Sequence, residues 1–313
     1  MEQNTTFKLN PKRKMTLTRK LFIISFITLP ILHFIVFYIY PNFNAFLMGF
    51  QKHEGVKVVW TLEHFVSIFQ RLQNGSDELV KSILNTLLTF GINMLMYPVS
   101  ILVSYFLYKK VFGYNFFRCV FFLPQIVSGV VFAFVYRRMC GVGEPLHLLM
   151  QSIANIKSTQ SLLMDERFAN TMVMVMMVWL NFPGAMVIWG GTFARIPDSV
   201  LEYAKLDGVG WIREVVSIII PMVWPTFSLF LVLQLATVFS ASGPVFLLTQ
   251  GEKGTQTLHN WFYMQVYGQE VHPNSNALNY MSAFGLLITV LGCALSLLVR
   301  KGLVKLLPDD VAF

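Results

Sequence analysis

The chain of 313 residues is 55% apolar and 15% aromatic, and only 13% of its residues are charged. Because soluble proteins carry about 25% charged residues, this composition excludes an ordinary water-soluble domain and indicates a membrane protein. The three cysteines, Cys119, Cys140 and Cys293, have no disulfide or metal-ligand spacing, so we interpret them as packed thiols.

Six apolar runs reach or approach the roughly 20 residues that an α-helix needs to cross a bilayer. In chain order they cover residues 21–40, 83–108, 119–136, 168–194, 222–248 and 277–299. The first run is too long for a signal-peptide core and lacks a small-residue cleavage pattern, so we predict an uncleaved anchor. The expected fold class is an all-α integral membrane protein with six transmembrane helices.

The charged residues between these runs predict the orientation. Segments on the side of the N-terminus would hold 15 basic and 7 acidic residues, and those on the opposite side 9 of each. Since cytoplasmic loops carry the excess of Lys and Arg, both termini are expected in the cytoplasm. The chain then divides into a basic N-terminal tail (1–20), a transmembrane domain (21–300) and a short C-terminal tail (301–313). The basic tail could bind nucleic acid, but beside a span we interpret it as a topology signal and expect no nucleic-acid partner.

The connection between the fourth and fifth runs, residues 195–221, is rich in charge. Ser199 and Glu202 have the spacing of a capping box, which predicts the start of a short helix. Gly208 can take the left-handed conformation that ends this helix, and Pro221 would stop or kink a second one. An amphipathic loop resting on the lipid surface would have the same pattern, so local physical reasoning leaves both interpretations open.

The same connection resembles the EAA loop of binding-protein-dependent ABC importer permeases. That pattern is Glu-Ala-Ala, three residues, Gly, nine residues and Ile-x-Leu-Pro, and the residues that match at this spacing are Glu202, Ala204, Gly208, Ile218 and Pro221. Tyr203 replaces the middle alanine, and Ile220 replaces the leucine. The stretches YIYPNFNAFLMGF, LEHFVSIF and VFLLTQGEKGTQTLHNWFY resemble segments of the carbohydrate-uptake branch of this family. The resemblance covers nearly the whole chain after residue 20.

The resemblance implies a permease subunit of a bacterial cell membrane, which forms half of a heterodimeric pore with a second permease subunit. It also implies two ATP-binding subunits and an extracytoplasmic solute-binding protein as partners, with a sugar or oligosaccharide as the solute and membrane lipid around the spans. The helix before Gly208 would dock on an ATPase subunit, where Ala204 would allow close approach and Glu202 and Asp207 would meet basic groups. Pro221 would end the coupling loop.

The sequence contains no pattern for a nucleotide, metal or other cofactor. It has no G-x-x-x-x-G-K-[ST] motif, and its six histidines are scattered. An intramembrane enzyme would need a nucleophile, a carboxylate pair or a metal cluster near one membrane face, and none is assembled. We therefore expect a transport subunit without a cofactor, and a membrane scaffold would leave the EAA spacing unexplained.

No Asp, Glu, Lys or Arg lies within the six apolar runs. This disfavours an ion-coupled secondary transporter, which is the alternative function, and suits a neutral, hydroxyl-rich solute. Polar residues inside the runs are candidate solute contacts, although most should join helices. We single out Asn181 with Trp179, since an amide pairs with hydroxyl groups and an indole face can stack on a sugar ring. Gln234 and Ser240 in the fifth run are further candidates.

Overall fold

The structure is a computed structural model that describes residues 17–55, 57–73, 77–154, 159–240, 243–267 and 276–306. Residues 1–16 and 307–313, which make up most of the two predicted tails, lie outside these ranges. Within the described ranges, the strands β1 (Gln51–Glu54) and β2 (Lys57–Trp60) form one antiparallel pair.

All other regular structure in the described ranges is helical. The helices are α1 (Leu17–Phe34), η1 (Ile35–Ile39), α2 (Tyr40–Met48), α3 (Glu63–Gln73), α4 (Asp77–Tyr108), α5 (Tyr114–Ile126), α6 (Gly129–Met139), α7 (Pro145–Ala154), α8 (Ala169–Phe193), α9 (Asp198–Leu206), α10 (Trp211–Glu214), η2 (Val215–Ile219), α11 (Ile220–Ala236), η3 (Val238–Ser240), α12 (Val245–Leu248), α13 (Leu258–Tyr267) and α14 (Asn276–Leu306).

In the described part of the chain, five helical stretches are long and apolar enough to cross a membrane. They are Leu17–Met48, Glu78–Tyr108, Ala169–Phe193, Trp211–Ala236 and Asn276–Leu303. The first, second, third and fifth of them match the predicted runs 21–40, 83–108, 168–194 and 277–299. The helices extend past several of the apolar runs, so charged residues such as Glu78 and Glu214 lie in their first turns.

The predicted span 119–136 is wrong as a single straight helix. The chain breaks between α5 and α6, which meet at an angle of 104°. Val127 and Ser128 have ψ angles of 138° and 130° at this break, which is extended rather than helical backbone. α5 alone has 13 residues and is about 20 Å long, which is shorter than the roughly 30 Å of a bilayer core. The described chain therefore has five straight candidate spans and one bent pair.

The predicted span 222–248 is wrong at both ends. The observed helix starts at Trp211, because Pro221 does not interrupt it, and it ends at Ala236. Proline lacks an N–H group, and its ring crowds the carbonyl of the preceding turn, so it removes a hydrogen bond from a helix that continues through it. The wider π-helical turns of η2 end two residues before Pro221, and those of η1 end two residues before Pro41. We conclude that these local π segments accommodate both prolines within continuous helices.

The most extensive contacts between helices join α4 to α8 and α11 to α14. Three hydrogen bonds connect α4 to α8: Asn170 Nδ2 to Asn85 Oδ1 at 3.0 Å, Asn181 Nδ2 to Asn93 Oδ1 at 3.3 Å, and Trp189 Nε1 to Ser100 Oγ at 2.8 Å. The residue numbers rise together along both helices, so α4 and α8 run parallel. In a membrane the hydrophobic effect hardly favours helix association, because lipid tails are as apolar as the side chains. Polar pairs of this kind therefore fix the register of two membrane helices.

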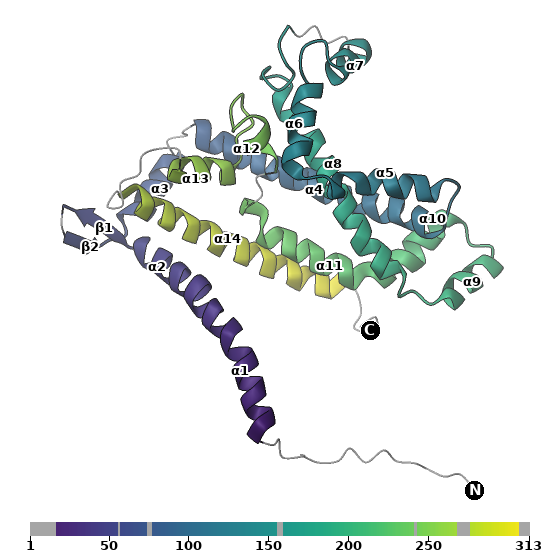
Figure 1. The fold of residues 1–313 in the computed structure, drawn as a ribbon, viewed down its shortest axis with the longest axis horizontal. Coiled ribbons are helices and arrows are strands. Elements are labelled where there is room, and N and C mark those ends of the chain that lie inside the picture. The colour runs from purple at the N-terminus through teal and green to yellow at the C-terminus, as the bar shows by residue number, and fades with distance from the viewer. Residues whose placement is uncertain are drawn as a thin grey trace.

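Some of the elements between the long helices lie at two opposite ends of the body, whereas α7 projects from another side (Figure 1). The β1–β2 pair, α3 and α13 lie at one end, and α9 lies at the other (Figure 1). α1 projects away from the body, and none of its residues is buried (Figure 1). A helix that is apolar all round is normally covered by lipid or by another chain, so α1 presents a surface that this chain does not cover.

Labelling of single cysteines should place α9 and α3 on opposite sides of the membrane. We expect Lys205→Cys to react with a membrane-impermeant maleimide only from the cytoplasmic side, and Gln73→Cys and Glu252→Cys only from outside. The reason is the excess of basic residues on the α9 side together with the separation of these elements in the fold. Inside-out and right-side-out vesicles would measure this, and reaction of Lys205→Cys and Gln73→Cys from one side would contradict it.

The exposure of the three native cysteines decides which of them must be replaced before this labelling experiment. Cys119 and Cys293 are exposed and need replacement. Cys140 is fully buried, and this burial raises the pKa of its thiol to about 11. Because the thiolate is the reactive form, Cys140 should stay unlabelled.

Candidate functional site

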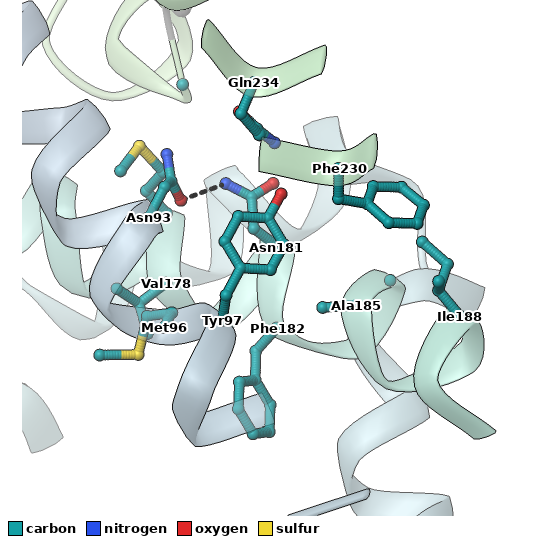
Figure 2. Close-up of a pocket in the computed structure, with 13 residues that line it drawn as sticks. Asn93, Met96, Tyr97, Val178, Asn181, Phe182, Ala185, Ile188, Phe230 and Gln234 are labelled. Carbon is teal, nitrogen blue, oxygen red and sulfur yellow. Dashed lines mark hydrogen bonds between the residues drawn. The ribbon is translucent and has the colours of Figure 1, made fainter. Parts of the chain in front are cut away.

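A cavity of about 400 Å³ lies between α4, α8 and α11 (Figure 2). Much of its wall is apolar and includes Met96 and Phe230. Four polar side chains from the three helices converge on it: Asn93, Tyr97, Asn181 and Gln234 (Figure 2). A mostly apolar cavity with a few convergent polar groups is the usual form of a small-molecule site.

The polar groups of this cavity are all neutral at physiological pH. Amides and phenols both donate and accept hydrogen bonds, which matches the hydroxyl groups of a sugar. The Asn181–Asn93 bond is long at 3.3 Å and uses one of the hydrogen-bonding positions of each amide, so both amides keep further capacity. Among the described residues that line the cavity, none is Asp, Glu, Lys, Arg or His.

Asn181 and Gln234, both predicted from the sequence, line this cavity, whereas Trp179 and Ser240 do not. Trp179 lies two residues before Asn181, which is about 200° around the helix. Its ring packs instead against Phe132 of α6, with ring centroids 5.6 Å apart. Ser240 lies in η3, beyond the end of α11. The structure therefore does not bring Trp179 and Asn181, two of the predicted solute contacts, to the same cavity.

Tyr97 is a cavity residue that the sequence analysis missed. It follows Asn93 by four positions, so the two side chains lie on one face of α4. It also interacts with Gln234 of α11. The spacing of two polar residues by four inside an apolar run is the signal that could have identified it.

The helix–turn–helix predicted for residues 195–221 is present, but the predicted capping box is wrong. α9 already begins at Asp198, so Ser199 lies within its first turn. Pro197 occupies the cap position without a side-chain hydrogen bond. The acidic side chain of Asp198 in this first turn stabilises α9 instead, through its attraction to the positive N-terminal end of the helix dipole.

The C-terminal end of α9 confirms the predicted left-handed glycine. Gly208 has φ +66°. Its N–H group donates to the Lys205 carbonyl at 3.1 Å, and the Val209 N–H group donates to the Ala204 carbonyl at 3.0 Å. These two bonds form a Schellman motif, which reverses the chain between α9 and α10. Open space surrounds the Gly208 Cα, so the backbone conformation rather than crowding requires glycine here.

The outer face of α9 combines apolar and acidic side chains. Tyr203 is 68% exposed and Leu206 is 82% exposed, and Glu202 and Asp207 are exposed beside them. Ala204 is only 5% exposed and faces its own chain. Contact of Ala204 with a partner, which the sequence led us to expect, is therefore not available in this conformation. Tyr203, the departure from the family pattern, instead lies on the outer face.

The inner face of α9 joins a buried group that we call the loop cluster. Its members come from α4, α8, the connection to α9, α9 itself, η2 and α11: Ile101, Tyr105, Trp189, Phe193, Ile196, Leu201, Val215, Ile219 and Val223. Because buried side chains pack as densely as a crystal, a displacement of α9 is passed to its neighbours. The loop cluster thus connects α9 with the same helices that line the cavity.

Among the described residues, no group of three or more His, Cys, Asp or Glu side chains could hold a metal ion. The long apolar helices define a multi-pass α-helical membrane protein, and the cavity between three of them has the form of a small-molecule site. The family described as binding-protein-dependent transport system inner membrane component matches residues 96–307, which is more than half of the chain. The chain therefore belongs to this family of transport permeases. It is a multi-pass inner-membrane subunit and not an enzyme.

Individual relatives agree with this membership. The chain is 27% identical over 192 residues to the probable ABC transporter permease protein YurN of Bacillus subtilis, across 59% of this chain and 63% of YurN. It is 23% identical over 280 residues to the multiple sugar-binding transport system permease protein MsmF of Streptococcus mutans, across 88% of this chain and 93% of MsmF. The match to YurN thus spans slightly less than two thirds of that protein.

A solved structure shares the fold. The crystal structure of a bacterial ABC transporter that imports the acidic polysaccharide alginate aligns with a TM-score of 0.76 and 17% identity, across 93% of this chain and 98% of that one. Another crystal structure of an alginate ABC transporter, in complex with a pentasaccharide-bound periplasmic protein, aligns with a TM-score of 0.72 and 18% identity, across 90% and 93% of the two chains.

The hydrogen bond between Trp189 and Ser100 should contribute measurably to the stability of the loop cluster. We expect Ser100→Ala to lower the free energy of unfolding by roughly 0.6–1.7 kcal/mol, since it leaves the buried indole N–H group unpaired. Unfolding of the detergent-solubilised chain by heat or by SDS would measure this.

The matched control is Ser199→Ala. Ser199 is exposed and makes no side-chain hydrogen bond with the described residues, and the observed start of α9 removes its predicted capping role. Its substitution should leave stability nearly unchanged. Equal destabilisation by both changes would contradict the helix boundary and the special contribution of Ser100.

Proposed function

We propose that this chain is the permease subunit of an ATP-driven importer for a neutral sugar or oligosaccharide. The observation that carries the proposal is the cavity between α4, α8 and α11, whose converging polar groups are amides and a phenol. The name of the relative MsmF refers to sugar-binding transport, which supports a carbohydrate solute. The absence of basic side chains from the described lining favours a neutral sugar over an acidic one such as alginate, because a carboxylate would need a paired charge.

The proposed topology has six spans, with the bent α5–α6 pair as the third and both termini in the cytoplasm. The loop at residues 195–221 then lies on the cytoplasmic side, and the β1–β2 pair, α3 and α13 lie outside. In this arrangement the chain supplies half of the pathway, a second permease subunit supplies the other half, and a solute-binding protein delivers the solute from outside. The exposed apolar α1 supports a neighbouring subunit or lipid as its cover.

We further propose that α9 docks on one of two ATP-binding subunits. Tyr203 and Leu206 supply an exposed apolar contact, and Glu202 and Asp207 supply acidic groups that basic residues of the partner would pair with. Closure of the ATPase dimer would displace α9, and the loop cluster would carry this displacement to α4, α8 and α11. The result is a population shift between inward-facing and outward-facing states of the cavity.

Substitution of Gly208 should uncouple the ATPase from transport. Gly208→Val forces a β-branched residue to φ +66°, so we expect the turn between α9 and α10 to be lost. ATP hydrolysis stimulated by the loaded binding protein should fall sharply in the reconstituted complex, while the chain still inserts into the membrane.

Gly210→Val is the matched control for this change. Gly210 has φ −66° and ψ 154°, which valine adopts readily, and open space surrounds it. Stimulated hydrolysis should therefore persist in Gly210→Val. Normal stimulation in Gly208→Val would rule out the proposed role of this turn.

Substitution of Asn181 should change selectivity among sugars that share one binding protein. Loss of one neutral hydrogen bond costs about 0.5–1.5 kcal/mol, so Asn181→Leu should weaken binding of a contacted solute roughly two- to tenfold. Uptake should slow unequally across the sugars, because each presents a different hydroxyl pattern. Thermal stability should fall only slightly, because the Asn181–Asn93 bond that is lost is long at 3.3 Å and the other two bonds between α4 and α8 remain. Uptake assays in proteoliposomes with a panel of sugars would measure this.

Trp179→Leu provides the comparison, since Trp179 lies on the same helix but outside the cavity. It should leave the order of preference among the sugars unchanged. If Asn181→Leu slows every sugar equally and lowers the melting temperature, Asn181 serves only to join α8 to α4.

A further inference from the structure

A buried ion pair lies where the coupling loop returns to the membrane helices. Lys109 Nζ is 2.6 Å from Glu214 Oε1, and the two side chains are 21% and 6% exposed. Lys109 directly follows the last residue of α4, and Glu214 is the last residue of α10. Among the ion pairs between described residues this one is the most deeply buried, since each of the others has a partner that is at least 59% exposed.

Further contacts hold the same two elements together. Lys109 Nζ lies 5.5 Å from the centre of the Tyr105 ring, which is a cation–π distance. One turn before Glu214, Trp211 packs against Phe106, with ring centroids 5.6 Å apart. The Tyr105 side chain interacts with Glu214 as well. The last turn of α4 and the first turn of the helix that leaves the coupling loop are therefore joined by charge, by aromatic contact and by packing.

An ion pair at this position differs in its effect from an apolar pair of similar size. Removing two charges from water is costly, and an apolar pair of similar size often stabilises a protein equally well. What an ion pair adds is specificity, because separating the two groups in a buried place would leave a charge without its partner, which is strongly destabilising. The pair therefore fixes the position of α10 relative to α4 in a way that apolar packing alone does not.

We infer that Lys109 and Glu214 are positioning residues that make the coupling loop and α4 move as one body. α4 carries Asn93 and Tyr97 of the cavity wall, so a displacement of α9 reaches the cavity through α4 as well as through α11. This inference rests on the proposed docking of α9. It adds a specific element to that proposal: the ion pair transmits the displacement and does not itself contact the ATPase.

The test separates docking, hydrolysis and movement of the cavity in the complete complex, reconstituted with its cognate subunits. Docking is measured as the yield of a cross-link between Leu206→Cys and the ATPase subunit. Movement is measured in a separate sample that carries Met96→Cys at a cavity position. The readout is how much ATP with vanadate changes the labelling of this cysteine by a membrane-impermeant maleimide. Neither readout needs an identified solute.

The single substitutions Lys109→Met and Glu214→Gln should leave the cross-link and ATP hydrolysis in place. The ATP-dependent change in labelling of Met96→Cys should shrink by roughly fivefold or more, the usual lower size of coupling between sites. The charge exchange Lys109→Glu with Glu214→Lys should recover much of this change, because the attraction is restored. Lys52→Met, which breaks an exposed ion pair with Glu63 near β1, is the matched control and should have no effect on movement.

Four results would overturn the inference. An undiminished labelling change in both single variants would show that the pair does not transmit movement. A parallel loss of cross-link and movement would assign the pair to docking. A lower melting temperature with normal movement would make the pair purely structural. Absence of the Leu206→Cys cross-link in the otherwise unaltered protein would contradict the docking of α9 itself, and the inference with it.

Discussion

The parallel pairing of α4 with α8 is the contact on which the other features of this permease depend. Three hydrogen bonds, at Asn85, Asn93 and Ser100 of α4, fix the register of the two helices along their length. The middle bond lies in the cavity wall, and the last one lies beside the loop cluster. One helix pair thus connects the proposed solute site with the proposed ATPase contact, and a change in its register would disturb both.

The sequence predicted the long helices well, because continuous apolar runs without charge have few alternatives to a membrane span. It failed where a break depends on backbone conformation rather than on composition. The 104° bend between α5 and α6 falls inside an apolar run, and hydropathy alone does not detect it. Pro221 was expected to stop or kink a helix, but the π-helical η2 accommodates it. The helix that corresponds to the predicted run 222–248 therefore starts earlier, at Trp211.

Part of the candidate site was predictable from the sequence, namely the residues whose type alone marks an unusual position. Gly208 was identified because only glycine suits its left-handed position, and Asn181 because an amide is rare in an apolar run. Trp179 was misplaced since closeness in sequence was taken for closeness in space, although two residues on a helix face different directions. Ala204 matches the family pattern but is buried, whereas Tyr203 departs from the pattern and is exposed. Which side of a short helix faces inward depends on tertiary packing, and a motif does not state it.

The central claim is that α9 and α4 form one rigid body that moves during the ATPase cycle. Pulsed electron paramagnetic resonance tests it directly, with one spin label at Lys205 of α9 and another at the exposed Val99 of α4. The distance between these labels should stay the same in the nucleotide-free and the vanadate-trapped complex, while the distance from Lys205 to the coupling loop of the second permease subunit changes. A change between Lys205 and Val99 as large as that between the two subunits would contradict the account.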